Sequence, residues 1–249
     1  MAGIMASRLK LLLAATGLAA LLQPALAEPP RAVVELFTSQ GCSNCPPADA
    51  LLVEYSKKPD IVALSFPVNY WDYLGWKDTL AHAEFTNRQK EYAHARSDRQ
   101  VFTPQMIVNG KKSCIGSDRA QIEKAIQTTG KGRSTLPVDV AITEQNGTVT
   151  VSITEMGEVQ HRDAEVWVLP ILRSQTVPIE RGENKGRTVT YANVVRGLKR
   201  IGEWRGGPAR FEVPATIARS GADGYVVLVQ AEEDDKPSVI LGAAKSPGL

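Results

Sequence analysis

Two cysteines three residues apart, followed at once by two prolines, constrain the fold of this chain more than any other feature. Cys42 and Cys45 come after a short apolar, β-branched run, Ala32–Phe37, which is typical of a buried strand. Pro46 and Pro47 follow, and proline is well tolerated at the first positions of a helix. The dithiol is therefore expected at a turn from a strand into a helix. There the free N–H groups and the helix dipole favour a thiolate at Cys42, and Cys45 lies close enough to resolve a mixed disulfide.

The next part of the chain alternates strand and helix patterns. The expected elements are helices over 48–55, 79–96 and 120–129, and strands over 61–68, 105–108 and 112–115. Because a helix separates the first two strands, we expect a right-handed parallel crossover between them. A dithiol after the first strand of such a series predicts an α/β domain of the thioredoxin type.

The helical period disappears after a charged, glycine-containing linker over 130–135. The expected strands of the second half cover 137–142, 148–153, 164–172, 188–195, 209–213, 225–230 and 239–241. About seven short strands with turn residues between them predict an all-β, sandwich-like domain. The domains expected are therefore residues 28–133, α/β, and residues 134–249, β-rich.

The first 27 residues have the features of a secretory signal peptide. Arg8 and Lys10 precede an apolar run over 11–22, and Ala25-Leu26-Ala27 is a small-x-small cleavage pattern. The run is short for a membrane anchor, which needs about 20 apolar residues. We expect cleavage after Ala27, a periplasmic or secreted protein, no membrane span in the mature chain, and a compartment in which disulfides form.

Several stretches carry a family resemblance. Residues 33–38 leading into 41–45, Thr103-Pro104 before 106–108, and Gly116-Ser117-Asp118 before a helix resemble a glutaredoxin. The mature chain resembles more closely an exported bacterial family, domain of unknown function 1223 (DUF1223), through residues 35–43, 70–76 and 191–195. The resemblance implies a thioredoxin-like domain followed by a β-rich domain, and it implies no activity. Residues 70–76 and the long helix after them are expected to be a helical insertion into the thioredoxin-like domain.

Thr103 and Pro104 are the second candidate feature of the site. Proline is expected at the first residue of a strand and disfavoured within it. In thioredoxin-like folds a proline at this place is cis, faces the dithiol and exposes the preceding backbone to a bound peptide. The alternative is an ordinary trans proline in a turn.

Other residues have both a functional and a structural interpretation. Glu35 transfers a proton while Cys45 resolves the mixed disulfide, or it is an edge-facing or salt-bridged residue of the strand. Trp71 and Asp72, within an aromatic segment over 70–76, bind substrate or pack the inserted helix. Asp118 marks the place where glutaredoxins hold glutathione, or it caps a helix. A polar loop over 181–187 is a solvated hairpin, or it folds back over the dithiol and supplies Arg or Asn contacts to a substrate.

These features favour a periplasmic thiol–disulfide oxidoreductase acting on a protein or small-thiol substrate. It needs no cofactor beyond the Cys42–Cys45 disulfide, and glutathione is a candidate co-substrate. The alternative is a non-catalytic binding module, for a soft metal such as Cu(I) or for a protein partner, with a metal-binding or structural CxxC. A structural zinc site needs about four ligands, and the sequence has neither a second CxxC nor histidines at a paired ligand spacing. A net charge of +2 argues against nucleic-acid binding. Cys114 is expected to be a buried free thiol. The substrate, the redox partner and the direction of electron flow stay open.

Overall fold

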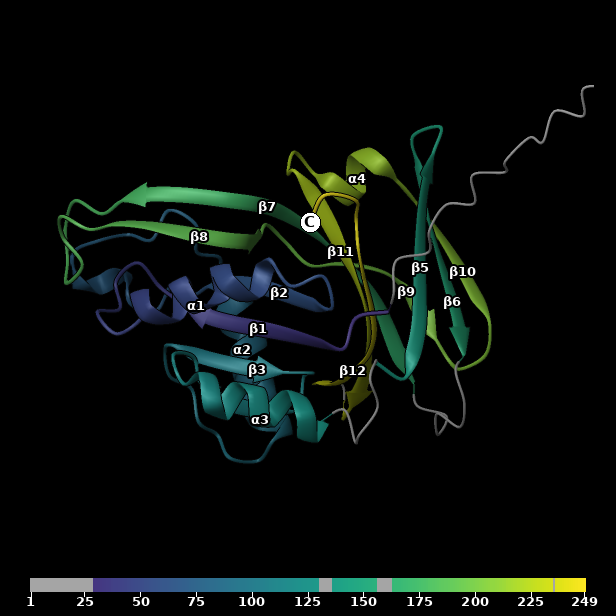
Figure 1. Cartoon of the computed structure of the whole chain (residues 1–249), viewed down its shortest axis with the longest axis horizontal. Coiled ribbons are helices and arrows are strands. Elements are labelled where there is room, and N and C mark those ends of the chain that lie inside the picture. Colours follow the sequence, from purple (N-terminus) through teal and green to yellow (C-terminus); the bar gives the residue numbers. More distant parts are fainter. Residues whose placement is uncertain (1–28, 130–135, 156–162, 235) are drawn as a thin grey trace, which may run out of the picture.

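The computed structural model describes residues 29–129, 136–155, 163–234 and 236–249 (Figure 1). The predicted signal peptide, its cleavage site after Ala27 and the predicted domain boundary at residue 133 lie outside the described residues. Within the described part of the chain, no helix is both long and apolar enough to cross a membrane.

The first half of the chain folds in the order expected from its pattern. Its elements are β1 (Ala32–Thr38), α1 (Pro46–Ser56), β2 (Ile61–Pro67), the 3₁₀ turn η1 (Asp72–Leu74), α2 (Ala83–Ala95), β3 (Gln105–Val108), β4 (Lys112–Ile115) and α3 (Arg119–Thr129). β1 pairs with β2 in parallel and with β3 antiparallel. Every residue of β1 and β2 is buried, which is why the sequences of both strands are mostly apolar.

The second half consists mainly of strands. Its elements are β5 (Val138–Gln145), β6 (Thr148–Glu155), β7 (Ala164–Pro178), β8 (Thr188–Val195), β9 (Lys199–Trp204), β10 (Ala209–Pro214), α4 (Ala215–Arg219), β11 (Gly224–Glu233) and β12 (Lys236–Lys245). β10, β6 and β5 form a small separate sheet. It packs over β7, β11 and β12 around a core of mainly Val and Ala side chains.

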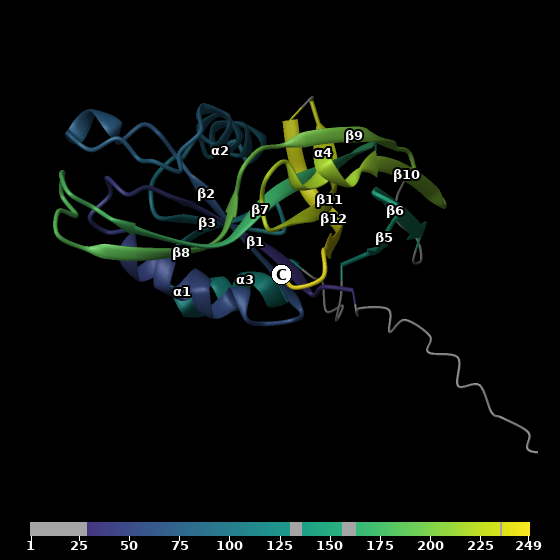
Figure 2. The ribbon, with the colours of Figure 1, turned by 90° about the horizontal axis from the view of Figure 1, so that it is seen from above.

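The predicted fold class, a thioredoxin-like α/β domain followed by an all-β, sandwich-like domain, is wrong. The protein is mostly β, and one nine-stranded mixed sheet runs through both halves in the order β12-β11-β7-β8-β2-β1-β3-β4, with β9 beside β7 (Figures 1 and 2). The join is a parallel pairing of β8 with β2, at Val194 and Ser65. Asn193 strengthens it by donating from Nδ2 to the carbonyl oxygen of Ala63, at 2.9 Å. β8 thus covers an edge of β2 that would otherwise carry unpaired backbone groups.

Helices cover both faces of β1. α1 and α3 lie on one face, where Val34 and Leu36 join their core, and α2 lies on the other, where Val33 and Phe37 pack (Figure 2). Alternation along the strand therefore places Glu35 on the α2 face.

Glu35 forms a buried ion pair that reaches three elements. Its carboxylate accepts from Arg88 Nε of α2 at 2.9 Å and from the Tyr92 hydroxyl at 2.5 Å. Arg88 also donates to Gln230 Oε1 of β11 at 2.8 Å, and Gln230 Nε2 donates to the Tyr92 hydroxyl at 2.7 Å. Glu35 is 0% and Arg88 4% exposed. Because no partner in this network has access to solvent, each depends on the others to satisfy its charge or hydrogen bonds.

Replacing Glu35 by Gln tests the network. The variant leaves Arg88 as a buried cation without its counter-charge, so we expect the free energy of unfolding to fall by about 3–5 kcal/mol in urea denaturation. Arg210→Gln is the control, since it breaks an exposed pair with Glu212 and is expected to cost less than about 1 kcal/mol. Equally small decreases in the free energy of unfolding of the two variants would show that the buried ion pair does not stabilise the fold.

Candidate functional site

The candidate site is centred on a disulfide between Cys42 and Cys45, with 5.4 Å between the two Cα atoms. Cys45 is the N-cap residue of α1, and its carbonyl oxygen accepts from the N–H groups of Ala48 and Asp49. The predicted position at a strand-to-helix turn is confirmed. Cys42 is 3% and Cys45 0% exposed, whereas Ser43 and Asn44 between them are exposed. Both cysteines are thus buried, and the exposed part of the disulfide loop is the Ser43-Asn44 pair between them.

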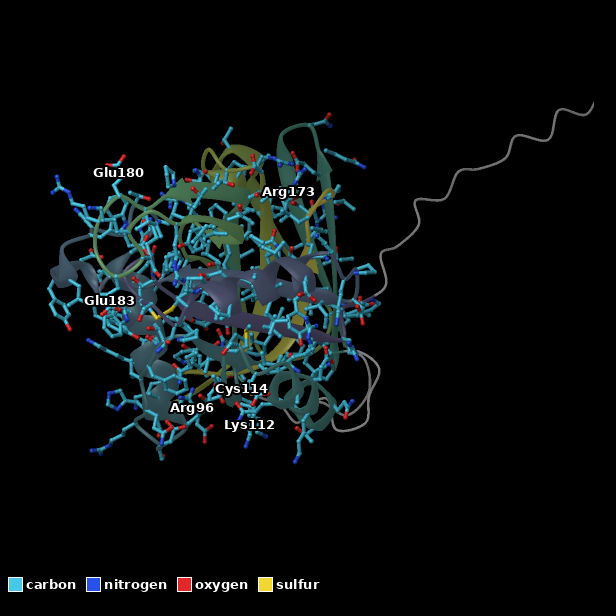
Figure 3. The ribbon with its side chains drawn as sticks, turned by 60° about the vertical axis from the view of Figure 1, so that its left-hand side comes forward. Arg96, Lys112, Cys114, Arg173, Glu180 and Glu183 are labelled. Atoms are coloured by element: carbon cyan, nitrogen blue, oxygen red, sulfur yellow. A yellow bond between two sulfur atoms is a disulfide. The ribbon has the colours of Figure 1, made fainter. Side chains whose placement is uncertain are left out.

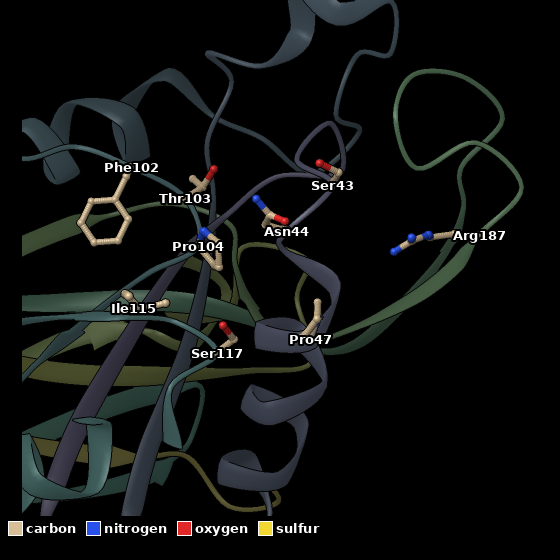
Figure 4. A pocket seen from close by; sticks show the side chains of 9 residues that line it. All are labelled: Ser43, Asn44, Pro47, Phe102, Thr103, Pro104, Ile115, Ser117 and Arg187. Atoms are coloured by element: carbon tan, nitrogen blue, oxygen red, sulfur yellow. The ribbon is translucent and has the colours of Figure 1, made fainter. Parts of the chain in front are cut away.

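Thr103 and Pro104 lie beside the disulfide loop, and the peptide bond between them is cis. They line a pocket of about 550 Å³ (Figure 4) whose lining residues are Ser43, Asn44, Pro47, Phe102, Thr103, Pro104, Ile115, Ser117 and Arg187. Trp71 Nε1 donates to Thr103 Oγ1 at 2.7 Å, so Trp71 orients one wall of the pocket. The structure thus brings Trp71, Thr103 and Pro104, which the sequence predicted as substrate-binding residues, to the loop that carries the disulfide.

Gly116 allows the close approach of three elements behind this pocket. A Cβ atom at this position would lie 2.8 Å from Leu36 Cδ1 and 2.9 Å from Pro104 Cβ. The Gly116 N–H group also donates to the Pro104 carbonyl oxygen at 2.9 Å. Any side chain here would displace Pro104 from β1, so this glycine determines the position of the pocket wall.

Three other predicted residues lie away from the pocket lining. Asp72 accepts from the N–H group of Asp78 at 3.1 Å, within its own loop. Asp118 accepts from the N–H group of Gln121 at 2.9 Å, as a cap of α3, while its neighbour Ser117 lines the pocket. Glu35 faces α2 on the opposite side of the sheet from α1, so the geometry does not bring it to Cys45. The predicted functional roles of these three residues stay predictions.

Asp49 is a residue that sequence reasoning missed. It lies one turn after Cys45 in α1 and is 2% exposed. Thr38 Oγ1 donates to its Oδ1 at 2.8 Å, while Oδ2 has no hydrogen-bond partner among the described residues. Burial raises the pKa of Asp49 to about 8, and the nearby Asp78 carboxylate adds to the effect. The available signal was an acidic residue at the i+4 position from a cysteine, on an otherwise apolar helix face.

A loop from the second half of the chain covers the disulfide. This cover loop, residues 179–187, connects β7 to β8 and lies on the disulfide side of the molecule, where Figure 3 labels Glu180 and Glu183. Asn184 is 1% exposed, and its Nδ2 donates to the carbonyl oxygens of Gln40 at 2.9 Å and Cys42 at 2.8 Å. The predicted alternative in which the polar loop folds back over the dithiol is the one that the structure shows.

The inserted segment over 70–80 holds the same turn from another side. Trp76 Nε1 donates to Gln40 Oε1 at 2.8 Å, and Asp78 accepts from the Gln40 N–H group at 2.8 Å. Gly182 of the cover loop packs against Trp76, where an added Cβ would lie 3.2 Å from that of the tryptophan. The turn that carries Cys42 is thus fixed between two loops.

Cys114 is a buried free thiol, as predicted, and burial raises its pKa to about 11. Across the described residues, no group of three or more His, Cys, Asp or Glu side chains is arranged to hold a metal ion.

A family model described as protein of unknown function (DUF1223) matches residues 33–230. The chain belongs to this family. The predicted family resemblance is therefore confirmed.

Two solved structures are similar to the chain. The crystal structure of an Agrobacterium tumefaciens protein, a structural-genomics target, is 35% identical, with a TM-score of 0.79 over 89% of this chain and 96% of that one. HBP35 of Porphyromonas gingivalis is 12% identical, with a TM-score of 0.58 over 88% of this chain and 75% of that one, and this likeness concerns the fold alone. No curated protein matches the chain.

The raised pKa of Asp49 predicts a pH-dependent stability. A carboxyl group whose pKa rises from 3.8 to about 8 on folding contributes stability that is complete below about pH 4 and is lost as the pH rises through about 8. Between about pH 5 and pH 8, the free energy of unfolding should fall by at least about 2 kcal/mol more in the wild type than in Asp49→Asn, because one pKa unit corresponds to about 1.4 kcal/mol.

Urea denaturation of the disulfide-bonded protein at several pH values measures this difference. Glu54→Gln is the matched control, since Glu54 is an exposed carboxylate on the same helix, and its pH profile should follow that of the wild type. Parallel profiles for the wild type and Asp49→Asn would contradict the assignment.

Proposed function

We propose that the protein is an exported thiol–disulfide oxidoreductase in which Cys42 exchanges with substrate and Cys45 resolves. The observation that carries the proposal is the Cys42–Cys45 disulfide at the amino end of α1, beside the pocket. Helix N-terminal N–H groups stabilise a thiolate there and make Cys42 a better nucleophile and leaving group at neutral pH.

The exchange has two balanced steps. A substrate thiolate attacks Cys42 Sγ, the Cys42–Cys45 bond breaks, and Cys45 leaves as a thiolate. A second substrate thiolate then attacks the substrate sulfur of the mixed disulfide, which releases the substrate disulfide and the Cys42 thiolate. Two electrons pass to the protein, and the reverse sequence reduces a substrate disulfide.

Asp49 is the candidate for holding a proton during this cycle, the role that the sequence suggested for Glu35. Residues at i and i+4 of a helix lie on one face, so Asp49 follows Cys45 along α1. With a pKa of about 8, its carboxyl group is protonated at neutral pH and can give a proton to the Cys45 thiolate. The free Oδ2 atom leaves that proton without another acceptor among the described residues.

Thr103 and Pro104 are proposed to bind substrate, because they line the pocket next to Ser43 and Asn44. The substrate is a protein or a small thiol, with glutathione as a candidate, and exchange requires no cofactor beyond the disulfide. Export through a signal peptide cleaved after Ala27 would place the protein in the periplasm or outside the cell, where disulfides persist.

A second candidate function is a non-catalytic binding module with a structural disulfide. The near-complete burial of Cys42 and Cys45 favours it, since reactive cysteines are usually partly exposed. In its metal-binding form, the reduced pair would hold a soft ion such as Cu(I).

Equilibration with glutathione redox buffers distinguishes these functions. For an oxidoreductase we expect a two-electron midpoint between about −120 and −270 mV. Cys45→Ser should accumulate a mixed disulfide at Cys42, Cys42→Ser should not exchange, and the control Cys114→Ser should behave as the wild type. Alkylation followed by mass spectrometry measures each species. A disulfide that does not exchange, but whose reduction lowers stability, would support the structural role, and copper retention that is lost in Cys42→Ser would support the metal site.

A further inference from the structure

The cover loop limits what can reach the disulfide. Cys42 is 3% exposed, and the buried Asn184 side chain bonds directly to the Cys42 carbonyl oxygen. A folded protein would have to bring its own cysteine to a buried sulfur, whereas a small thiol can bind in the adjacent pocket, which Ser43 and Asn44 of the disulfide loop line. The pocket volume of about 550 Å³ lies within the range of sites for small molecules.

Arg187 gives this pocket its charge. It is the one charged side chain among the described lining residues, and it comes from the end of the cover loop. Figure 4 shows its guanidinium pointing toward Asn44 and Pro47. The guanidinium has no hydrogen-bond or ion-pair partner within the described part of the chain, so its donors are available to a ligand.

The remaining lining suits a short ligand with one apolar side. Asn44, Thr103 and Ser117 contribute hydrogen-bonding groups, and Phe102, Pro104 and Ile115 form an apolar surface. An arginine with free donors binds a carboxylate in preference to a neutral or cationic group, because two charge-assisted hydrogen bonds form at once.

We propose that the site selects low-molecular-weight thiols that carry a carboxylate, which Arg187 binds while the sulfur reaches Cys42. This inference rests on the proposed exchange activity and specifies its substrate class. The thiolate attacks Cys42 Sγ, Cys45 leaves as a thiolate, and a second thiol of the same kind completes the reduction as described above. Arg187 changes no bond in either step and acts by positioning the substrate.

Three thiols of similar size test the selection: 3-mercaptopropionate, 2-mercaptoethanol and cysteamine, which are anionic, neutral and cationic. The rate of reduction of the Cys42–Cys45 disulfide is measured for each thiol and divided by the thiolate concentration. It is then divided by the rate at which the same thiolate reduces a small uncharged disulfide, because thiolate nucleophilicity depends on the thiol pKa. We expect the anionic thiol to react about 5 to 10 times faster than the neutral one, and the cationic thiol to be slowest. Added salt should reduce the ratio, because the charges interact near solvent.

Arg187→Gln should bring the three corrected rates close together. Arg181→Gln is the matched control, since Arg181 lies in the same loop but does not line the pocket, and the variant should keep the wild-type ratio. Equal rates in the wild type and in both variants would overturn the carboxylate selection while leaving the exchange activity intact. If none of the thiols reduces the disulfide, the exchange activity itself fails.

Asn184→Ala tests the covering role of the loop separately. Loss of the two hydrogen bonds should increase the rate with a protein dithiol, such as reduced thioredoxin, by a larger factor than the rate with 2-mercaptoethanol. A protein dithiol that reduces the wild-type disulfide as fast as the small thiols would contradict the size limit.

Discussion

The buried ion pair between Glu35 and Arg88 is the constraint on which the architecture depends. Two charges removed from water are tolerated only with close partners, and here those partners come from β1, α2 and β11. The pairing of β8 with β2 makes the same connection through backbone atoms. Gln230 of the second half completes the hydrogen bonds of Arg88 and Tyr92, so the network and the β8–β2 pairing together connect the two halves of the chain.

The positions of most strands could be predicted from the sequence, but which strands pair with one another could not. The run over 188–195 predicts β8 with its observed bounds, because its apolar and β-branched residues are a local signal. Its pairing with β2 joins residues far apart in the chain, and local patterns carry no information about such register. β9 was missed, since Lys-Arg-Ile-Gly-Glu-Trp has neither an apolar run nor a regular alternation.

Some residues of the candidate site are likewise predicted by local sequence patterns, whereas others are revealed only by the packing. Cys42, Cys45, Thr103 and Pro104 belong to short motifs whose spacing places them at element ends. The structure places Thr103 and Pro104 beside the loop that the disulfide closes. Asp49 has an ordinary sequence context, and its functional interest comes from burial that only the packing of α1 reveals. Glu35, a charged residue among apolar neighbours in the first strand, was the proton-transfer candidate in the sequence, but it lies on the face of the sheet opposite α1.

The cover over Cys42 also has a consequence for the order of events during synthesis. Asn184 follows Cys42 by 142 residues, so the two cysteines emerge long before the loop that encloses them. During that interval the two thiols lack the cover that the loop provides in the folded protein. Once β7 and β8 join the sheet, Asn184 bonds to the turn that carries Cys42, and both cysteines are buried. The two cysteines are therefore open to solvent in the unfolded chain and buried in the finished fold, so their accessibility changes when the second half of the chain docks.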